Sequence, residues 1–512
     1  MSPVRVYDTL TRQSHTVSAR DGQSVTVYCC GPTVYDVPHA GHARSAVAFD
    51  ILVRHLRARG HAVKYVRNVT DIDDKILTRA RERGEPPLEL SRRMTTVYQD
   101  QIAAVGCTAP DVEPRVSDHL PEIFALIERL IEQGAAYTVD MPGDTRDVYF
   151  SVRKFQGYGK LSRRRIDELI AGARVEKDET KQDPLDFALW KGAPEAEWGW
   201  QSPWGHGRPG WHIECSAMSA KYLGHGFDIH AGGMDLIFPH HENEIAQSEA
   251  AHPGEGDFAR CWMHNGFVNV DKEKMSKSLG NFVTVSDVLE RNDPEAFRWF
   301  LLTVHYRGPI QFETAQADAG RVTFPGVDEA ERRVDYMMQT LLRLDRAAAE
   351  GGGGGAPPAE VQRATAAVSA SREAALAALD DDLNTPVALA ELGEIAKVGN
   401  ELLDLALRRR KDAAFAAAAA GFAAKTASSL REVAAVLGLL RATTAEYLVR
   451  TRERRLRLRG LSADTLDEAI AERFAARQRK DFVRADALRD ELSAQGIVLR
   501  DGPEGTEWSV EP

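Results

Sequence analysis

His39-Ala40-Gly41-His42 decides the fold, because of what stands on either side of it. The apolar run Val25 to Cys30 before it predicts a strand, and the apolar spacing of Ala43 to Leu56 after it predicts a helix. The tetrapeptide therefore stands at a strand-to-helix turn, where exposed backbone N–H groups and the positive end of the helix dipole favour phosphate. The sequence predicts a nucleotide site at this turn.

Alternating strands and helices continue this pattern through the first half of the chain. Val63 to Val69 predicts the second strand, and further strands are predicted at Phe227 to His230 and Cys261 to Val270. Such alternation is typical of a doubly wound parallel sheet of the Rossmann type. Ligands bind at the carboxyl ends of strands in that fold, so Asn68 and Thr70 are candidate pocket residues.

A short cationic segment, Lys274-Met275-Ser276-Lys277-Ser278, follows past the middle of the chain. By itself it is explained equally well as a solvated loop. A lysine pair also suits the charge that develops on a phosphate during displacement. In this order, the two segments resemble the HIGH and KMSKS signatures of the class I aminoacyl-tRNA synthetases, with HAGH standing for the first.

That resemblance implies both the reaction and its residues. The reaction would be activation of an amino acid by ATP, with Mg²⁺ arriving with ATP, followed by transfer to tRNA. Catalysis would come from positioning and charge stabilisation, with Lys277 as the first choice for the transition-state contact. The residues implied in catalysis are His39, His42, Lys274 and Lys277, and those implied in ATP binding are His39, Gly41, His42, Gly233, Asp235 and Lys277.

A second set of residues has metal-binding chemistry. Cys30 ends the first predicted strand, Cys215 stands in a Trp-His-Ile-Glu-Cys-Ser run, and Phe238 to Glu244 supplies further donors. His240 and Glu244 are four residues apart after a proline. On a helix beginning there they share one face and can bind one ion.

These positions resemble the zinc ligands of the cysteinyl-tRNA synthetase family, a branch of class I. The resemblance extends nearly end to end, through Asn68 to Lys75 and the tail Asp481 to Asp486. It implies a ligase that converts L-cysteine to cysteinyl-adenylate and transfers it to tRNA(Cys). The implied ligands of one Zn²⁺ are Cys30, Cys215, His240 and Glu244, and the implied cysteine pocket is Gly31, Thr33, Asn68, Thr70 and Trp211.

Zinc would give such a pocket a means of rejecting serine. Apolar and hydrogen-bonding pockets discriminate between such similar side chains by only about 100-fold. A thiol with a pKa of about 8.5 becomes a thiolate on zinc, whereas an alkyl hydroxyl is far less acidic and a poorer soft ligand. Rejection of about ten-thousandfold needs about 5.5 kcal/mol. We therefore expect no separate editing domain.

One question about the metal stays open at this point. Four protein ligands are typical of a closed structural zinc site, whereas a substrate-binding zinc keeps a position free. Either Glu244 yields to the substrate or the ion expands its coordination.

The remaining cysteines and the second histidine have simpler interpretations. Buried cysteines are common as small hydrophobic residues, and Cys29, Cys107 and Cys261 are interpreted as structural. His241 would point to another face of the helix than His240, so we expect it behind the metal ligands or on the surface.

Length and composition indicate a multidomain cytoplasmic enzyme. The chain has 512 residues, five cysteines and no apolar run near twenty residues, which argues for a reducing compartment without membrane attachment. No dimerisation segment is obvious, and a monomer is expected. The net charge of −11 requires local positive charge for a tRNA partner, and six arginines between Arg450 and Arg459 supply it.

The second half changes to long helices. Amphipathic spacing at Arg363 to Leu379, Val387 to Arg410 and Ala427 to Leu440 predicts a helical bundle. Beyond Ser462 we expect a small unit of two helices and a strand at Gly496 to Arg500. The resemblance assigns anticodon recognition to this end of the chain, with four candidate residues: Trp508, Asp501, Arg477 and Lys480.

The predicted architecture is thus α/β, a Rossmann-type catalytic domain with an insertion, followed by an α-helical bundle and a small mixed α/β C-terminal domain. The expected boundaries are 1–115 and 202–270 for the catalytic domain, 116–201 for the insertion that contacts the acceptor end, 271–320 for the cationic loop and stem-contact region, 321–450 for the anticodon-binding bundle, and 451–512 for the basic segment and C-terminal domain.

Two other functions remain to be compared. A cysteine:aminosugar ligase paralogue would keep the zinc and adenylate site but lack the anticodon-binding carboxyl end, which this chain retains. A non-catalytic zinc-containing RNA-binding protein would be expected to have lost the loop lysines or the paired histidines, and this chain has both.

Overall fold

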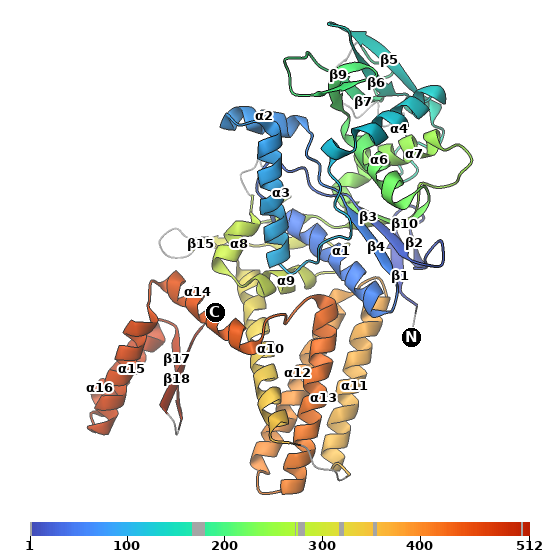
Figure 1. Ribbon diagram of the computed structural model, residues 1–512. Helices are drawn as coiled ribbons and strands as arrows, with labels where there is room; N and C mark the ends of the chain where they lie inside the picture. Colours follow the sequence, from blue (N-terminus) through green and yellow to red (C-terminus); the bar gives the residue numbers. More distant parts are fainter. Residues whose placement is uncertain are drawn as a thin grey trace.

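A four-stranded parallel sheet lies at the centre of the computed structural model, which describes residues 3–165, 180–271, 273–274, 282–316, 322–351, 356–502 and 505–511. The strand order is β11-β10-β3-β4, and every neighbouring pair is parallel (Figure 1). Strands covered on both faces are near-continuous apolar runs, which is why they could be recognised in the sequence. The Rossmann-type prediction is confirmed. The strands are β3 (Val25–Cys29), β4 (Val63–Arg67), β10 (Phe227–Gly233) and β11 (Ala259–Asn265).

Helices connect and cover these strands. The predicted helix after the HAGH segment is α1 (Ala40–Ala58), which crosses from β3 to β4. The hairpin of β1 (Arg5–Asp8) and β2 (Gln13–Thr16) lies beside β11. The other helices of this region are α2 (Asp74–Arg83), α3 (Pro87–Ala104), α4 (Leu120–Glu132), α6 (Trp211–Leu223) and α7 (Glu242–Ala251).

A separate antiparallel sheet is inserted between β4 and β10, at the top of Figure 1. Its strand order is β5-β6-β7-β9-β8, and it extends to Pro209. The strands are β5 (Ala136–Met141), β6 (Thr145–Phe150), β7 (Phe187–Gly192), β8 (Trp200–Ser202) and β9 (Gly205–Pro209).

The single strand predicted at Cys261 to Val270 is two strands in different sheets. After β11 the chain turns at Gly266, where an added Cβ would lie 2.3 Å from the carbonyl oxygen of Gly308. Only glycine allows this close approach. The next strand, β12 (Val268–Val270), pairs with β13 (Glu273–Lys274) and β14 (Ile310–Phe312).

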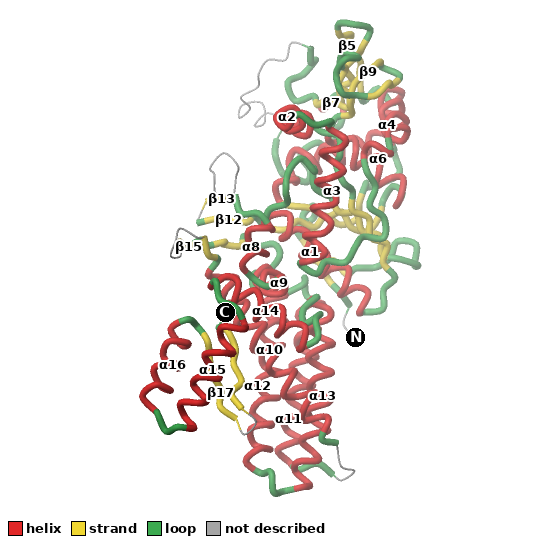
Figure 2. Tube along the Cα trace, turned by 60° about the vertical axis from the view of Figure 1, so that its left-hand side comes forward, coloured by secondary structure: helices red, strands yellow, loops and turns green. Residues whose placement is uncertain are grey.

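Long helices form the bundle that the sequence predicts (Figure 2). They are preceded by α8 (Val285–Arg291), α9 (Pro294–Leu302) and the pair β15 (Ala315–Gln316) and β16 (Val322–Thr323). The alanine-rich stretch 413–424 and the predicted helix after it are one helix, because alanine is the strongest helix former. The bundle helices are α10 (Pro325–Ala349), α11 (Ala359–Asp380), α12 (Thr385–Arg408) and α13 (Ala413–Leu437).

The C-terminal unit stands to one side of the bundle in Figures 1 and 2. It contains a two-stranded antiparallel hairpin, whereas the sequence predicted a single strand. Its elements are α14 (Thr444–Arg459), α15 (Ala463–Gln478), α16 (Phe482–Ala494), β17 (Ile497–Gly502) and β18 (Gly505–Val510).

One hydrophobic core runs from the catalytic sheet into the bundle. Val27 of β3, Phe297 of α9, Leu341 of α10 and Leu430 of α13 are all buried in it. The C-terminal unit has a small core of its own, which includes Leu466. Within the described residues, every helix is too short or too polar to cross a lipid bilayer.

Candidate active site and metal centre

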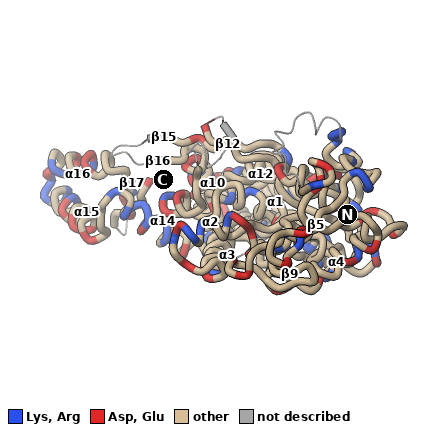
Figure 3. Tube along the Cα trace, turned by 90° about the horizontal axis from the view of Figure 1, so that it is seen from above, with Lys and Arg blue, Asp and Glu red and all other residues tan. Residues whose placement is uncertain are grey.

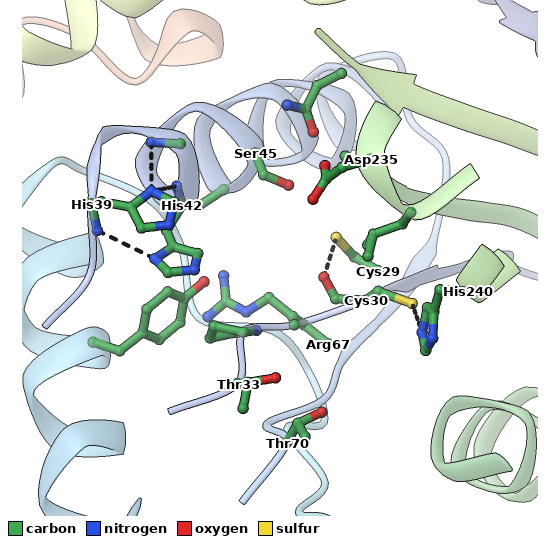
Figure 4. Close-up of a pocket in the computed structure, with 18 of the residues that line it drawn as sticks. Cys29, Cys30, Thr33, His39, His42, Ser45, Arg67, Thr70, Asp235 and His240 are labelled. Carbon is green, nitrogen blue, oxygen red and sulfur yellow. Dashed lines mark hydrogen bonds between the residues drawn. The ribbon is translucent and has the colours of Figure 1, made fainter. Parts of the chain in front are cut away.

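A cavity of about 350 Å³ opens at the carboxyl ends of β3, β4 and β10 (Figure 4). The chain leaves β3 towards β4 on one side and has β10 on the other, so this is the place where doubly wound sheets bind ligands. Among the lining residues are many that the sequence singled out: Cys30, Gly31, Thr33, His39, Gly41, His42, Thr70, Trp211, Cys215, Gly233, Asp235 and His240.

The HAGH segment begins α1 with an imidazole cap. Nδ1 of His39 accepts hydrogen bonds from the backbone N–H groups of Gly41 (3.0 Å) and His42 (3.4 Å). Nδ1 of His42 in turn accepts from the backbone N–H of His39 (3.2 Å), and the two rings stack with centroids 3.7 Å apart. The backbone N–H groups predicted to be exposed to phosphate are thus capped by His39, and the ring pair lines the cavity in their place.

The chain on either side of the cationic segment is placed near this ring pair. Lys274 lies in β13, in register with Asn269 of β12. After the segment, the Phe282 ring packs edge-on against the His39 ring, with centroids 4.7 Å apart, and Thr284 forms a backbone bridge to His39. The side chain of Lys274 and all of Lys277, both predicted to be catalytic, lie outside the described side chains.

Four buried side chains form a compact ligand set at one wall of the cavity. The ligand atoms of Cys30, Cys215, His240 and Glu244 all lie within 4.8 Å of one another. The two sulfur atoms are 3.6 Å apart, and Nε2 of His240 is 3.0 Å from Oε1 of Glu244. Two thiols, an imidazole and a carboxylate are donors that zinc prefers in tetrahedral sites.

The protonation of this cluster suits a cation. Burial raises the pKa of Glu244, but the neighbouring His230 and His240 outweigh it and lower the pKa to about 2. Burial also raises the pKa of Cys215, yet hydrogen bonds from Cys30 and His240 bring it to about 6. Burial raises the pKa of Cys30 well above its ordinary value. Burial lowers the pKa of His240, but Glu244 and Cys215 outweigh it and raise the pKa to about 10. The buried carboxylate is therefore balanced by an imidazolium, whose proton a metal ion would replace.

Further histidines surround the four ligand atoms. Nε2 of His230 donates to Oε2 of Glu244 at 2.8 Å, and Nδ1 of His212 is 2.9 Å from Nδ1 of His240. His241 is fully buried and pairs with His264, so a surface position for it is wrong. His230 was missed, although a polar residue inside an apolar strand run was an available signal.

Glycine and threonine shape the floor of the cavity. An added Cβ at Gly31 would lie 1.6 Å from the backbone oxygen of Asn68, so a larger residue cannot fit. The Asn68 side chain lies behind this wall: its Oδ1 accepts from the Gly31 N–H (2.8 Å) and its Nδ2 donates to Thr70 (3.2 Å). Thr33 and Thr70 form a backbone bridge.

Aromatic residues line the cavity beside the metal cluster and beside the HAGH turn. Trp211, which is 37% exposed, stacks on the His240 ring with centroids 4.3 Å apart. Tyr98 of α3 meets His42 edge-on, with centroids 6.3 Å apart. Sequence reasoning missed Tyr98, Arg67 and Lys75, which also line the cavity.

The arginines of α14 were interpreted from the sequence as local positive charge for tRNA, but several of them are paired with acidic residues of the protein itself. Arg450 pairs with Asp293, and Arg454 and Arg455 are buried against Glu331. These side chains join α14 to the body of the protein, so they are not a free basic surface. Figure 3 shows acidic and basic residues interspersed over α15 and α16.

Three of the four predicted anticodon contacts have partners inside the C-terminal unit. Asp501 accepts from Arg473 (2.8 Å) and pairs with Arg477 (2.5 Å). The indole of Trp508 donates to Asp467 (3.2 Å). The fourth residue, Lys480, is exposed.

Comparison with family models matches three segments of the chain. Residues 16–320 match the class I (C) catalytic domain of tRNA synthetases, residues 376–441 match the DALR domain, and residues 458–508 match the cysteinyl-tRNA ligase anticodon binding domain.

Similar proteins cover the chain from end to end. The cysteine–tRNA ligase of Anaeromyxobacter dehalogenans is 51% identical over 99% of this chain and 100% of its own length. That of Geobacter metallireducens is 44% identical over 99% of both chains, and the chloroplastic/mitochondrial enzyme of Arabidopsis thaliana is 44% identical over 98% of this chain and 85% of its own.

A solved structure shares the fold. Methionyl-tRNA synthetase of Mycobacterium tuberculosis, in complex with methionyl-adenylate, superposes with a TM-score of 0.62 over 86% of this chain and 95% of that chain. The sequence identity is 17%, so this likeness concerns the fold alone.

Proposed function

Because the chain belongs to the cysteine–tRNA ligase family of class I aminoacyl-tRNA synthetases, we propose that the described cavity carries out both steps of cysteinyl-tRNA formation. The enzyme joins L-cysteine to tRNA at the expense of ATP, releasing AMP and pyrophosphate. The observation that supports the location is the shared cavity: the HAGH turn forms one wall, and Cys30, Cys215 and His240 of the cluster line another.

We assign the metal centre to one Zn²⁺, held by Cys30, Cys215, His240 and Glu244. When bound, zinc supplies a soft Lewis acid that takes the substrate thiol as thiolate. The fit rests on the donor set, two thiols, an imidazole and a carboxylate whose ligand atoms all lie within 4.8 Å of one another. The hydroxyl side chain of serine is much less acidic than the thiol of cysteine, which supports selection without an editing domain.

The residues around the cavity are assigned to positioning. Thr33, Thr70 and Trp211 enclose the cysteine, with Gly31 providing room and Asn68 holding Gly31 and Thr70 in place. Gly233 and Asp235 stand at the end of β10 for the amino group or the adenosine.

The nucleotide side is assigned to the HAGH turn and the cationic segment. The cysteine carboxylate attacks the α-phosphorus of ATP, and the electron pair of the breaking bond leaves with pyrophosphate. In this proposal His39, His42, Lys274 and Lys277 stabilise the charge on the phosphates, and Mg²⁺ arrives with ATP. The terminal ribose hydroxyl of tRNA then attacks the activated carbonyl, releasing AMP.

We further propose that tRNA(Cys) is the acceptor, that the insertion contacts its acceptor end, and that the bundle and C-terminal unit contact its anticodon side. All five cysteines are buried and unpaired, which suits a reducing cytoplasm. A monomer is proposed as well, and light scattering of the purified protein tests it.

The test of function is transfer of labelled cysteine onto bulk tRNA in the presence of ATP, with serine in parallel. Charging with cysteine alone is expected. Formation of adenylate without charging would instead favour the cysteine:aminosugar ligase, and equal charging with serine would contradict selection by zinc.

A further inference from the structure

Arg67 lies between the metal cluster and the HAGH turn. It ends β4, in register with Cys29 of β3, and its Cγ is 3.5 Å from where a Cβ on Gly31 would stand. Its guanidinium lies over Tyr98, 5.3 Å from the ring centroid, and Tyr98 in turn meets His42. Figure 4 shows the side chain extending across the cavity from the Cys30 side towards His42.

The hydrogen-bond donors of this guanidinium are incompletely used. The side chain of Arg67 is 5% exposed, and its Nη2 donates to Oε1 of Glu113 at 2.8 Å. Its Nε is buried and has no acceptor among the described residues. A guanidinium has five N–H donors, and buried donors without a partner are rare in native proteins. Because Arg67 lines the cavity and Glu113 takes a bond from Nη2 alone, a ligand in the cavity can accept from the outer N–H groups of the guanidinium.

The place of Arg67 between the metal cluster and the HAGH turn indicates which group of the substrate it binds. A substrate thiol at Cys30 and Cys215 would leave the rest of the amino acid facing the HAGH turn, where the nucleotide is activated. The group that crosses this space is the α-carboxylate, whose planar oxygens match the guanidinium fork. Among the described residues that line the cavity, the one other lysine or arginine is Lys75, which is exposed and lies over the Tyr35 ring.

We propose that Arg67 binds the α-carboxylate of the cysteine substrate and aims it at the α-phosphorus of ATP. This inference rests on the function proposed above. Arg67 holds one carboxylate oxygen while the other forms the bond to phosphorus, so the contact passes to the carbonyl oxygen of the adenylate. No proton transfer is required.

The experiment compares two ligands on two forms of the zinc-loaded protein. Cysteamine has the thiol and amine of cysteine but no carboxylate. In Arg67→Gln, the equilibrium dissociation constant of L-cysteine is expected to rise by about 10- to 100-fold, as for loss of a charge-assisted hydrogen bond. The dissociation constant of cysteamine is expected to change by less than about twofold. Arg67→Lys keeps the positive charge but loses the planar guanidinium. Its dissociation constant for L-cysteine should lie between those of the unmodified protein and Arg67→Gln.

One variant serves as the control. Arg59→Gln breaks an ion pair with Asp380 outside the cavity. It is expected to bind cysteine as the unmodified protein does. Zinc per chain and the thermal midpoint, measured on every variant, separate loss of the carboxylate contact from loss of metal or fold.

Each other outcome contradicts a different statement. Equal weakening of cysteine and cysteamine in Arg67→Gln, or no weakening of either, overturns the carboxylate contact and leaves the ligase function intact. Weakened ATP binding with normal cysteine binding would assign Arg67 to the α-phosphate instead. Failure of the unmodified protein to bind cysteine at all would overturn the proposed function.

Discussion

Cys215 shows how much depends on one sulfur atom. It lies 3.6 Å from the sulfur of Cys30 and is 2% exposed. Replacing Cys215 with serine is expected to lower zinc per chain and cysteine-dependent pyrophosphate exchange together, because a hydroxyl is a poor soft ligand. Metal analysis and the exchange assay measure the two effects.

Cys261→Ser is the matched control, because that thiol is 7% exposed and not part of the described ligand set. It should retain full zinc. Normal activity in a Cys215→Ser protein without metal would contradict the zinc assignment.

At the residue scale the sequence predicted ligands that follow from spacing. His240 and Glu244 share a face because they are four apart, and the structure places their ligand atoms 3.0 Å apart. It could not predict the role of Arg67, because this residue lies on a strand whose neighbours are far away in the chain. The roles of all the site residues stay predictions, and the side chain of Lys274 and all of Lys277 also lie outside the described residues.

At the scale of helices, a buried ion pair joins α9 to α1. Arg298 is fully buried and pairs with Asp50, and it also donates to the backbone of Leu437 at the end of α13. Burial raises the pKa of Asp50, but Arg298 and Arg54 outweigh this and the net pKa is lowered. The carboxylate thus stabilises the fold while it is charged.

Arg298→Gln is therefore expected to lower the free energy of unfolding by about 3 kcal/mol at neutral pH, since it leaves a buried carboxylate with a weaker partner set. A group with a lowered pKa contributes stability above its unfolded pKa of about 3.9 and loses it as the pH falls further. The difference between the two proteins should shrink below about pH 4.

Urea unfolding across a range of pH values measures this difference. The control is Arg332→Gln, whose pair with Glu329 is more than half exposed on both sides and should change stability by less than about 1 kcal/mol. A difference for Arg298→Gln that stays constant down to pH 3 would contradict the role of the Asp50 charge.

Sequence periodicity predicted where strands and helices lie, but it did not predict which elements pack together. The central strands were predicted because both faces are buried, and the bundle helices because their spacing is regular. The run Cys261 to Val270 was predicted as one strand, whereas it forms two. The break at Gly266 depends on a close approach to Gly308, which is 42 residues away and gives no signal in the local sequence.

At the scale of the whole molecule, an ionic cluster fixes the C-terminal unit to the body. Oε1 of Glu331, in α10, accepts from Arg455 at 2.7 Å and also from Arg454. Arg455 also reaches the backbone of Val510 in the last strand (3.0 Å). The sequence shows these arginines as a basic run because their acidic partners lie more than 100 positions away.

Glu331→Gln should therefore disturb recognition of the tRNA more than chemistry. The KM for tRNA is expected to rise by about tenfold, the equivalent of about 1.4 kcal/mol. Cysteine-dependent pyrophosphate exchange should stay unchanged, because the cavity lies in the other half of the molecule.

Aminoacylation and exchange kinetics on the same preparation provide the comparison. Glu329→Gln, two residues away and exposed, is the control and should leave both unchanged. A parallel fall in exchange and charging would show that the cluster supports the whole fold rather than the position of the C-terminal unit.

The two kinds of hydrophobic core have different consequences for evolution. The catalytic sheet and the bundle share one core, so a lineage that deleted the bundle would uncover the apolar faces of α1 and α9 and lose the enzyme. The C-terminal unit packs around a small core of its own, with Leu456 of α14, Leu466 and Ile497 among its residues. Gene fusion or truncation can exchange this unit without repacking the rest. Descendants of this architecture can therefore change what they recognise at the far end more readily than how they activate cysteine.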